Sequence, residues 1–219
     1  MTEATAAPAP RGAAVGRGIG IGLMYGLFRP RVLGAWRVPT KGPVILAVNH
    51  AHNLDGPMLM GTAPRPVHFL IKKEAFVGPL DPFLRGIGQL KVDRTTVDRN
   101  AITQALGVLD DGGVLGIFPE GTRGEGDFAS LRAGLAYFAV RGGAPIVPVA
   151  VLGSTERRGR LISALPPLRS RVDVVFGEAF QAGDGSGRRT RKALDEATLR
   201  IQGKLTAHLE NARRLTGRL

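Results

Sequence analysis

The chain has 219 residues, of which 43% are hydrophobic, a length and composition that suit one globular domain with a sizeable core. It contains no cysteine, which excludes disulfides, thiolate catalysis and cysteine-bound zinc. The 30 Lys and Arg residues exceed the 18 Asp and Glu residues by a net charge of +12, which favours partners that carry phosphate groups. Aromatic residues make up only 5% of the chain, too few for base-stacking platforms, and we expect no nucleic-acid partner.

The N-terminal part divides into a tail and an apolar segment. Residues 1–12 are rich in Ala and Pro and lack periodicity, which predicts a disordered tail. Residues 13–31 are expected to form an N-terminal apolar helix. Its uncharged stretch, at 18–28, is too short to span a bilayer, because a spanning helix needs about 20 apolar residues.

Glycines recur at a spacing of four in this segment, as in the pairs 16/20, 18/22 and 22/26, and such spacing lets a helix approach its neighbour closely. Two interpretations stay open. The helix packs on the domain, or it lies in the membrane interface as an anchor, with Arg29, Arg31 and Trp36 near the lipid headgroups.

From residue 32 the chain alternates between strand-like and helix-like patterns. Apolar residues at helical spacing, followed by Gly-Gly stops, predict helices at 98–109 and 130–140. Short apolar or β-branched runs between them predict strands. The alternation indicates an α/β fold over residues 32–183, with a mostly parallel central sheet flanked by helices. The strands are expected at 44–48, 67–71, 90–92, 114–118, 146–152 and 172–176.

Residues 184–219 are expected to form a basic linker and a C-terminal amphipathic helix. Apolar residues at three- and four-residue spacing between 194 and 212 form one stripe. We expect this stripe to dock on the domain rather than on a membrane or a partner, since the apolar face of such a helix usually faces the core.

Polar residues follow directly after the first of these strands. His50 comes two positions after the run 44–48, and Asp55 follows five positions later. Five residues of helix separate two side chains by about 140°, and five of strand place them on opposite faces, so the chain must turn if the two are to meet. A strand–loop–helix junction would bring them together at the C-terminal edge of the sheet, where α/β proteins bind ligands.

Two further strands end in polar groups, and a third contains a proline. Asp93 and Arg94 follow the run 90–92, and Pro-Glu-Gly-Thr-Arg occupies 119–123. Pro148 interrupts the run 146–152 and predicts an edge, a bulge or a special backbone contact, because proline cannot donate to a strand ladder. This pattern is expected of a pocket at one sheet edge.

Taken in order, these blocks resemble those of the glycerolipid acyltransferase family, most closely the bacterial 1-acyl-glycerol-3-phosphate acyltransferases. The resemblance covers about residues 32–176. His52 departs from it by standing where Ser is usual, and Lys91 by standing where an aromatic or apolar residue is usual; both are expected beside the reaction centre or the acceptor pocket. The matching blocks are Asn-His-x4-Asp at 49–55, Gly-x3-Val-Asp-Arg at 88–94, Phe-Pro-Glu-Gly-Thr-Arg at 118–123 and Ile-Val-Pro-Val at 146–149.

The resemblance implies acyl transfer from a thioester, either acyl-CoA or acyl carrier protein, to the sn-2 hydroxyl of 1-acyl-glycerol-3-phosphate, which gives phosphatidic acid. The attacking hydroxyl must lose a proton, so we assign His50 as general base and Asp55 as the carboxylate that orients it. No covalent acyl-enzyme and no cofactor are expected. No metal is expected either, because His50, His52 and Asp55 supply only three ligands on a tight turn.

The resemblance also assigns substrate-binding roles. Arg94 and Arg123 suit a phosphate, because guanidinium groups bind it through a bidentate fork. Gly121 would allow close backbone approach, and Glu120 is expected to hold an arginine or a glycerol hydroxyl. The residues placed at the glycerol-phosphate site are Arg94, Glu120, Gly121, Thr122 and Arg123, and Pro148 is placed on the acyl-donor side.

Other functions remain as alternatives. The same chemistry could act on a lyso-ornithine lipid or a glycolipid, as the departures at His52 and Lys91 allow. The base could activate water in a thioesterase-like hydrolase, or the chain could be a non-catalytic basic module that binds anionic membranes or nucleic acid. The leading interpretation is a peripheral enzyme on the cytoplasmic face of the cell membrane, where positive charge attracts anionic lipid, CoA phosphates or an acidic carrier protein.

Overall fold

The structure, a computed structural model, describes residues 10–121, 125–154, 157–158, 161–162, 166–183 and 190–218. Its centre is a seven-stranded sheet with the order β1-β9-β6-β2-β5-β3-β4. All neighbouring strands run parallel except β6 and β9, which confirms the expected mostly parallel α/β fold. The strands are β1 (Arg29–Leu33), β2 (Val44–Val48), β3 (His68–Lys72), β4 (Leu90–Val92), β5 (Val114–Ile117), β6 (Ile146–Leu152) and β9 (Arg171–Phe176), and a separate antiparallel pair comprises β7 (Arg157–Arg158) and β8 (Leu161–Ile162).

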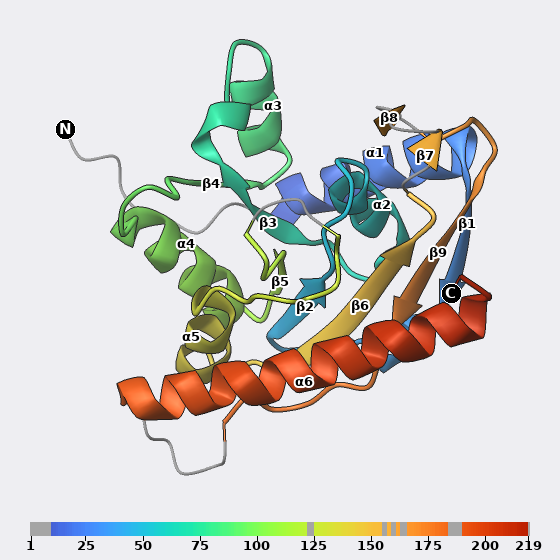
Figure 1. The fold of residues 1–219 in the computed structure, drawn as a ribbon. Helices are drawn as coiled ribbons and strands as arrows, with labels where there is room; N and C mark the ends of the chain where they lie inside the picture. Colours follow the sequence, from blue (N-terminus) through green and yellow to red (C-terminus); the bar gives the residue numbers. More distant parts are fainter. Residues whose placement is uncertain are drawn as a thin grey trace.

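Helices cover both faces of this sheet (Figure 1). Along β2, Ile45 and Ala47 face the core beneath α4, α5 and α6, whereas Val44, Leu46 and Val48 face the core beneath α1 and α2. A strand that is buried on both faces needs a continuous apolar run, which explains the sequence of β2. The helices are α1 (Pro10–Leu27), α2 (Asp55–Thr62), α3 (Leu80–Gly86), α4 (Arg99–Asp110), α5 (Gly134–Arg141) and α6 (Arg191–Thr216), with short 3-10 turns η1 (Ala35–Arg37) and η2 (Lys73–Ala75).

α6 crosses the sheet as a docked helix, as its apolar stripe predicts. Thr190 caps its N-terminus by accepting a hydrogen bond from the amide of Ala193, and Gly217 ends it in the left-handed conformation. The stripe is buried against the sheet and α5, through Ala197, Ile201, Leu205, Leu209 and Ala212.

The glycines of α1 bring this helix against α2. A Cβ added to Gly61 would lie 2.5 Å from the carbonyl oxygen of Gly20, so the two backbones touch. By contrast, Gly18 and Gly22 have no atom within 4 Å of an added Cβ. The close helix approach that the four-residue spacing predicts is therefore confirmed at Gly20. Among the described residues, no helix is both long and apolar enough to cross a membrane.

Three boundaries differ from the sequence-based expectation. α1 begins at Pro10, so the predicted end of the tail, at residue 12, lies inside this helix. Proline is well suited to a first helical turn. Residues 1–9 lie outside the described part. α5 begins at Gly134 rather than at 130. Arg29 and Arg31 lie in a strand, β1, and Arg31 binds the fully buried carboxylate of Asp173 at 2.6 Å.

Pro148 lies opposite a bulge within the sheet. Pro148 is the strand partner of Ala47 in β2, and its carbonyl accepts a hydrogen bond from the amide of Gly177. The ladder to β9 ends at the pair Val149 and Phe176, and the next bridge joins Ile146 to Phe180. Two residues of β6 thus face three on the other side, which confirms the bulge among the predicted alternatives and excludes an edge strand.

Candidate active site

The junction after β2 brings His50 and Asp55 together at the C-terminal edge of the sheet. β2 ends, the chain turns, and α2 begins at Asp55. Asn49 anchors this turn to β6, because its side-chain nitrogen donates to the carbonyl of Val151 at 3.1 Å and its oxygen accepts from the Val151 amide at 2.7 Å. The strand–loop–helix junction that the sequence predicts is therefore present.

The carboxylate of Asp55 is fully buried and accepts hydrogen bonds on both oxygens. Oδ2 accepts from the amides of Ala51 at 2.9 Å and His52 at 2.7 Å, and Oδ1 accepts from the hydroxyl of Ser154 at 2.7 Å. Nδ1 of His50 lies 3.3 Å from Oδ2. A buried carboxylate is tolerated only when its charge is compensated, and these donors compensate it.

The contact with Asp55 distinguishes the two nitrogens of His50. Because a carboxylate only accepts, Nδ1 carries the proton in this contact, and Nε2 of the neutral imidazole keeps its lone pair. The imidazole also stacks on the ring of Phe118, with centroids 4.2 Å apart. One nitrogen and one face of the ring are thus held, while the other nitrogen can accept a proton.

Glu120 lies beside this imidazole but faces backbone groups. Its Oε1 accepts from the backbone amide of His50 at 3.4 Å. Burial raises the pKa of the Glu120 carboxyl, the charge of Asp127 adds to this, and the hydrogen bonds from the backbone of His50 and Phe128 oppose it. Among the described residues no ion pair joins Glu120 to an arginine; Arg123 lies outside them, so the arginine-holding role stays a prediction.

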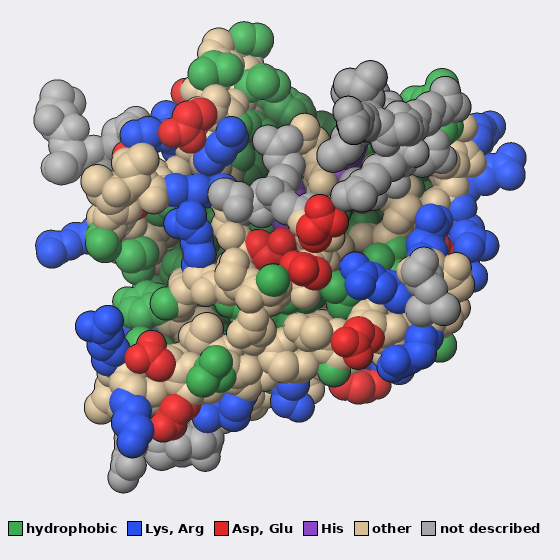
Figure 2. Space-filling model, viewed as in Figure 1, with side chains coloured by type: hydrophobic (Ala, Val, Ile, Leu, Met, Phe, Trp, Pro, Cys, Tyr) green, Lys and Arg blue, Asp and Glu red, His purple; other side chains and the backbone are tan. Residues whose placement is uncertain are grey.

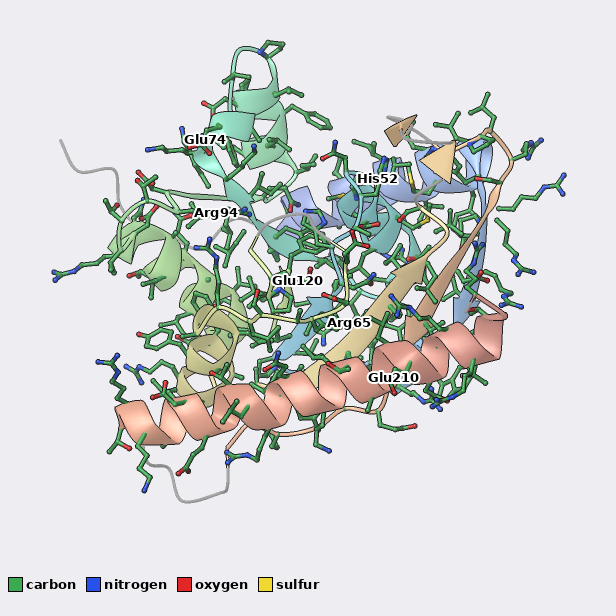
Figure 3. The ribbon with its side chains drawn as sticks, in the orientation of Figure 1. His52, Arg65, Glu74, Arg94, Glu120 and Glu210 are labelled. Atoms are coloured by element: carbon green, nitrogen blue, oxygen red, sulfur yellow. The ribbon has the colours of Figure 1, made fainter. Side chains whose placement is uncertain are left out.

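Arg94 reaches from the end of β4 to the loop after β5 (Figure 3), where its Nη1 donates to the carbonyl of Gly121. Gly121 has a φ of +73°, and an added Cβ would overlap the guanidinium of Arg132. Both the backbone angle and the close approach require glycine there. Arg94 and Arg132 both approach Gly121, so two guanidinium groups share this loop. Burial lowers the pKa of Arg94, the charge of Arg132 lowers it further, and the charge of Glu74 opposes this.

The two residues that depart from the family pattern have structural contacts. His52 is buried, and its Nδ1 accepts from the amide of Leu54 at 3.2 Å, so it supports the turn. Lys91 places its ammonium group 5.5 Å from the ring centroid of Phe76. Thr122 and Arg123, which the sequence also assigned to the site, lie outside the described residues.

Asp93 makes contacts that suit a structural role. Its carboxylate binds Lys73 at 2.6 Å and accepts from the amide and hydroxyl of Thr95. These contacts hold the pKa of Asp93 below its ordinary value, with the hydrogen bond from Lys73 as the largest cause.

A cavity of about 460 Å³, the first cavity, opens beside His50. α1, α2, α3 and β3 supply most of its walls. The lining is mainly apolar, with Arg94 and Lys72 among its few charged groups. Its walls include Gly16, Ile19, Gly20, Leu23, Met60, Ile71, Phe83, Ile87 and Phe118.

A second cavity, of about 400 Å³, lies beside the first, between α4 and α5. His52, Lys91 and Pro148 are not among the described residues that line either cavity. The ring of Pro148 instead lies beside Gly177, near the imidazole of His208 on α6. The structure therefore does not bring Pro148 to the cavity that His50 lines.

The acyltransferase family model matches residues 29–152, more than half of the chain. The chain belongs to the acyltransferase family. The matched region of this acyltransferase contains His50, Asp55, Arg94 and Glu120, which the structure gathers at one edge of the sheet. The family resemblance read from the four sequence blocks is thereby confirmed.

Individual relatives agree with this assignment. The acyltransferase is 28% identical over 156 residues to a 1-acyl-sn-glycerol-3-phosphate acyltransferase of Bacillus subtilis (strain 168), covering 70% of this chain and 75% of that protein. It is 31% identical over 129 residues to the protein of the same name from Borreliella burgdorferi, covering 57% of this chain and 52% of that protein. The crystal structure of the 1-acyl-sn-glycerophosphate (LPA) acyltransferase PlsC from Thermotoga maritima superposes with a TM-score of 0.70 at 21% identity, over 94% of this chain and 80% of that chain, and establishes the fold.

Sequence reasoning missed three residues of this site. Ser154 follows β6 as His50 follows β2, and because these neighbouring strands are parallel, their ends meet at one edge. The equal spacing of His50 and Ser154 after their strands could therefore have indicated that Ser154 belongs to the site. Phe118 was read only as part of a block, although it stacks on His50. Arg132 lies outside every block, and no local pattern marks it.

Proposed function

We propose that this acyltransferase transfers a fatty acyl group from acyl-CoA or acyl carrier protein to the sn-2 hydroxyl of 1-acyl-glycerol-3-phosphate. One arrangement carries the proposal: the buried Asp55 carboxylate holds Nδ1 of His50 at the wall of an apolar cavity that Arg94 also lines. The names of the relatives from Bacillus subtilis and Borreliella burgdorferi support the same acceptor.

In the proposed mechanism His50 acts as general base. Nε2 takes the proton of the sn-2 hydroxyl while the oxygen attacks the thioester carbonyl. The tetrahedral intermediate then breaks its carbon–sulfur bond, the new ester forms, and the departing thiolate takes the proton back from the imidazolium. Asp55 keeps the ring oriented and stabilises its positive charge during this exchange. The acyl group passes directly between substrates, so no acyl-enzyme forms.

The first cavity suits the hydrocarbon chain of the acyl donor. Its walls are mainly apolar, and His50 lies on them, so a chain inside it would end with its thioester beside the base. Burial of each methylene group favours binding by about 0.8 kcal/mol, which makes the depth of this cavity a physical limit on chain length.

The loop after β5 suits the acceptor's phosphate. Arg94 and Arg132 both approach Gly121 there, and a dianion would relieve their mutual repulsion. By resemblance, Arg123 would add a third guanidinium, and Thr122 would lie beside it. Glu120 would repel a phosphate, and its place next to His50 suits a contact with a glycerol hydroxyl.

The outer surfaces of α1 and α3 support docking on an anionic membrane. Both helices line the first cavity, and both carry large apolar side chains that are exposed to solvent, some of them at the cavity itself. Lipid could thus reach the cavity from the bilayer surface. A net charge of +12 favours the anionic cytoplasmic leaflet. The exposed apolar residues are Val15, Ile19, Leu23, Tyr25 and Leu27 on α1, and Leu80 and Phe83 on α3.

Purified protein incubated with radiolabelled acyl-CoA, with and without 1-acyl-glycerol-3-phosphate, tests the proposal. We expect labelled phosphatidic acid only when the acceptor is present. Labelled free fatty acid alone would indicate a hydrolase. If labelled lipid formed only with lyso-ornithine lipid or a lysoglycolipid, that lipid would replace 1-acyl-glycerol-3-phosphate as the proposed acceptor. His50→Ala should lower turnover roughly 10²- to 10⁴-fold while leaving the melting temperature within a few degrees of wild type. Retained turnover in that variant would refute the assignment of His50.

A further inference from the structure

The second cavity adjoins the first but is separated from His50. The two cavities share Leu70, Arg94 and Phe118 as lining residues. His50 lines only the first, and its imidazole stacks on Phe118. The Phe118 ring therefore belongs to a partition between two chambers, with the base on one side of it and Arg94 on the boundary.

The interior of the second cavity is apolar. Its floor lies between α4 and α5, where Ala101 and Leu135 are almost completely buried and Ile102 is half-buried. Methyl and aromatic groups from both helices and from β5 complete this floor, so the chamber suits a hydrocarbon better than a polar group. The apolar lining comprises Leu70, Ala101, Ile102, Ile117, Leu135 and Phe138.

The rim of this cavity is positively charged. Arg94 and Arg132 both line it, and among the described residues no ion pair joins either guanidinium to a carboxylate. In the view of Figure 2, blue Lys and Arg side chains gather between α3 and α5. This arrangement favours a ligand with an anionic group at the rim and an apolar part inside.

The two carboxylates of this cavity are already engaged. Asp93 binds Lys73 at 2.6 Å. Asp98 caps α4 by accepting from the amide of Ala101 at 3.0 Å, and it also accepts from the amide of Asp93 at 2.9 Å. Among the described residues, neither carboxylate forms an ion pair with the guanidinium groups of the rim.

The proposed reaction requires two fatty chains to converge on one imidazole. The donor chain suits the first cavity, because its thioester must lie beside His50. In the acceptor, the phosphate, the reacting hydroxyl and the chain are carried by three adjacent carbons. A phosphate on the rim, at Arg94 and Arg132, would direct the hydroxyl past Phe118 toward His50 and leave the second cavity next to the remaining carbon.

We propose that the second cavity receives the 1-acyl chain of the acceptor, with Arg94 and Arg132 holding its phosphate at the rim. This inference rests on the proposed function. It assigns the two hydrocarbon chains to separate chambers, so that acceptor and donor chain lengths are selected by different residues.

The variant Ile102→Trp tests the assignment by filling the second cavity. Steady-state kinetics would be measured with one donor and with 1-hexanoyl, 1-lauroyl and 1-palmitoyl acceptors. We expect KM for the two longer acceptors to rise at least roughly tenfold, because the tryptophan displaces buried methylene groups. KM for the hexanoyl acceptor and for the donor should stay within about twofold of wild type. Leu106→Trp, one turn further along α4 and lining neither cavity, is the matched control and should leave all values unchanged.

Two kinetic results would overturn the inference. Equal KM values of Ile102→Trp and wild type at every acceptor length would mean that the acceptor chain lies elsewhere, for instance in the bilayer. A rise in the donor KM alone would assign the second cavity to the donor. A melting curve of each variant verifies that the comparison concerns folded protein, and Ile102→Phe repeats the test with a smaller ring if Ile102→Trp does not fold.

A binding measurement separates this inference from the proposed function. Calorimetry with dodecyl phosphate, below its micelle concentration, reports binding of an amphipathic anion without turnover. We expect binding to wild type that weakens at least roughly tenfold in Ile102→Trp and stays unchanged in Leu106→Trp. If that result appears without any acyl transfer, the proposed function fails and the cavity assignment stands as an amphipathic-anion site. Equal binding to all three proteins would reject the cavity assignment whatever the activity.

Discussion

The hydroxyl of Ser154 donates a 2.7 Å hydrogen bond to Oδ1 of Asp55, although 99 positions separate the two residues in sequence. Both side chains are buried, Asp55 completely and Ser154 to 98%. The same carboxylate binds Nδ1 of His50 through its other oxygen. We therefore propose that Ser154 is a positioning residue, which acts on the imidazole through Asp55; among the described residues it lines neither cavity.

Removal of this hydroxyl should lower turnover more than substrate binding. In Ser154→Ala we expect kcat to fall roughly tenfold with both KM values nearly unchanged, because a hydrogen bond to a buried charged group is worth about 1.5–3 kcal/mol. Ser154→Thr keeps a hydroxyl and should restore most of kcat. Steady-state kinetics on the three proteins check this. Matching losses of kcat in the Ala and Thr variants would contradict the positioning role.

Arg132 should affect the acceptor selectively. In Arg132→Ala we expect KM for 1-acyl-glycerol-3-phosphate to rise roughly 10- to 100-fold, because one charged partner of the phosphate is lost, while KM for the donor stays the same. Arg132→Lys should recover part of the loss, since it keeps charge but not the fork. Arg141→Ala, an exposed position at the end of α5, is the matched control. Equal changes in both KM values would argue against phosphate binding at Arg132.

The glycine contact between α1 and α2 should be sensitive to a single methyl group. Gly61→Ala places a Cβ 2.5 Å from the backbone oxygen of Gly20, which cannot yield as a side chain does. We expect a loss of about 1–3 kcal/mol in the free energy of unfolding and a weaker affinity for long-chain donors, since α1 lines the first cavity.

Gly22→Ala is the control for that variant. It lies on α1, the helix that Gly61 contacts, and an added Cβ would meet nothing within 4 Å. Alanine should raise stability there by about 0.5–1 kcal/mol through its helix propensity. Chemical denaturation of both variants measures the difference, and equal stabilities would show that the α1–α2 contact is looser than the structure indicates.

His208 should make the fold sensitive to acid. Burial lowers the pKa of this imidazole below the ordinary value of 6.5, the charge of Arg37 lowers it further, and the hydrogen bond to the carbonyl of Val175 opposes this. The unfolded chain therefore binds the proton more readily than the folded one. The stability contributed by neutral His208 is present above pH 6.5 and is lost as the pH falls through and below that value.

Melting temperatures between pH 8 and pH 5 test this linkage. His208→Gln keeps a donor for the Val175 carbonyl but cannot titrate in this range. Its melting temperature should therefore fall less steeply than that of wild type below about pH 6.5. Burial also lowers the pKa of His68, although its hydrogen bond to the carbonyl of Gly88 opposes this. His68 should therefore contribute the same acid sensitivity in this variant as in wild type. Parallel curves would exclude a contribution from His208.

Local patterns in the sequence were sufficient for six of the seven strands of the main sheet, for α4, α5 and α6, and for the pairing of His50 with Asp55. The run 44–48 is apolar at every position because both faces of β2 are covered, and Asp98 before α4 is a cap that is recognisable from residue type alone. His50 and Asp55 lie only five positions apart, so a single turn of the chain can join them. Such features depend on nearby residues, and a linear reading can find them.

The tertiary structure alone decided the features that depend on distant residues. β1 was missed because its arginines conceal a strand, and the buried carboxylate of Asp173 that binds Arg31 comes 142 positions later. Ser154 becomes part of the site only because parallel β2 and β6 end at one edge. The sequence determined which chemical groups the chain carries and roughly which elements bear them. Packing determined which groups meet and how Phe118 helps divide the pocket, because contact energies depend on distances in space rather than positions along the chain.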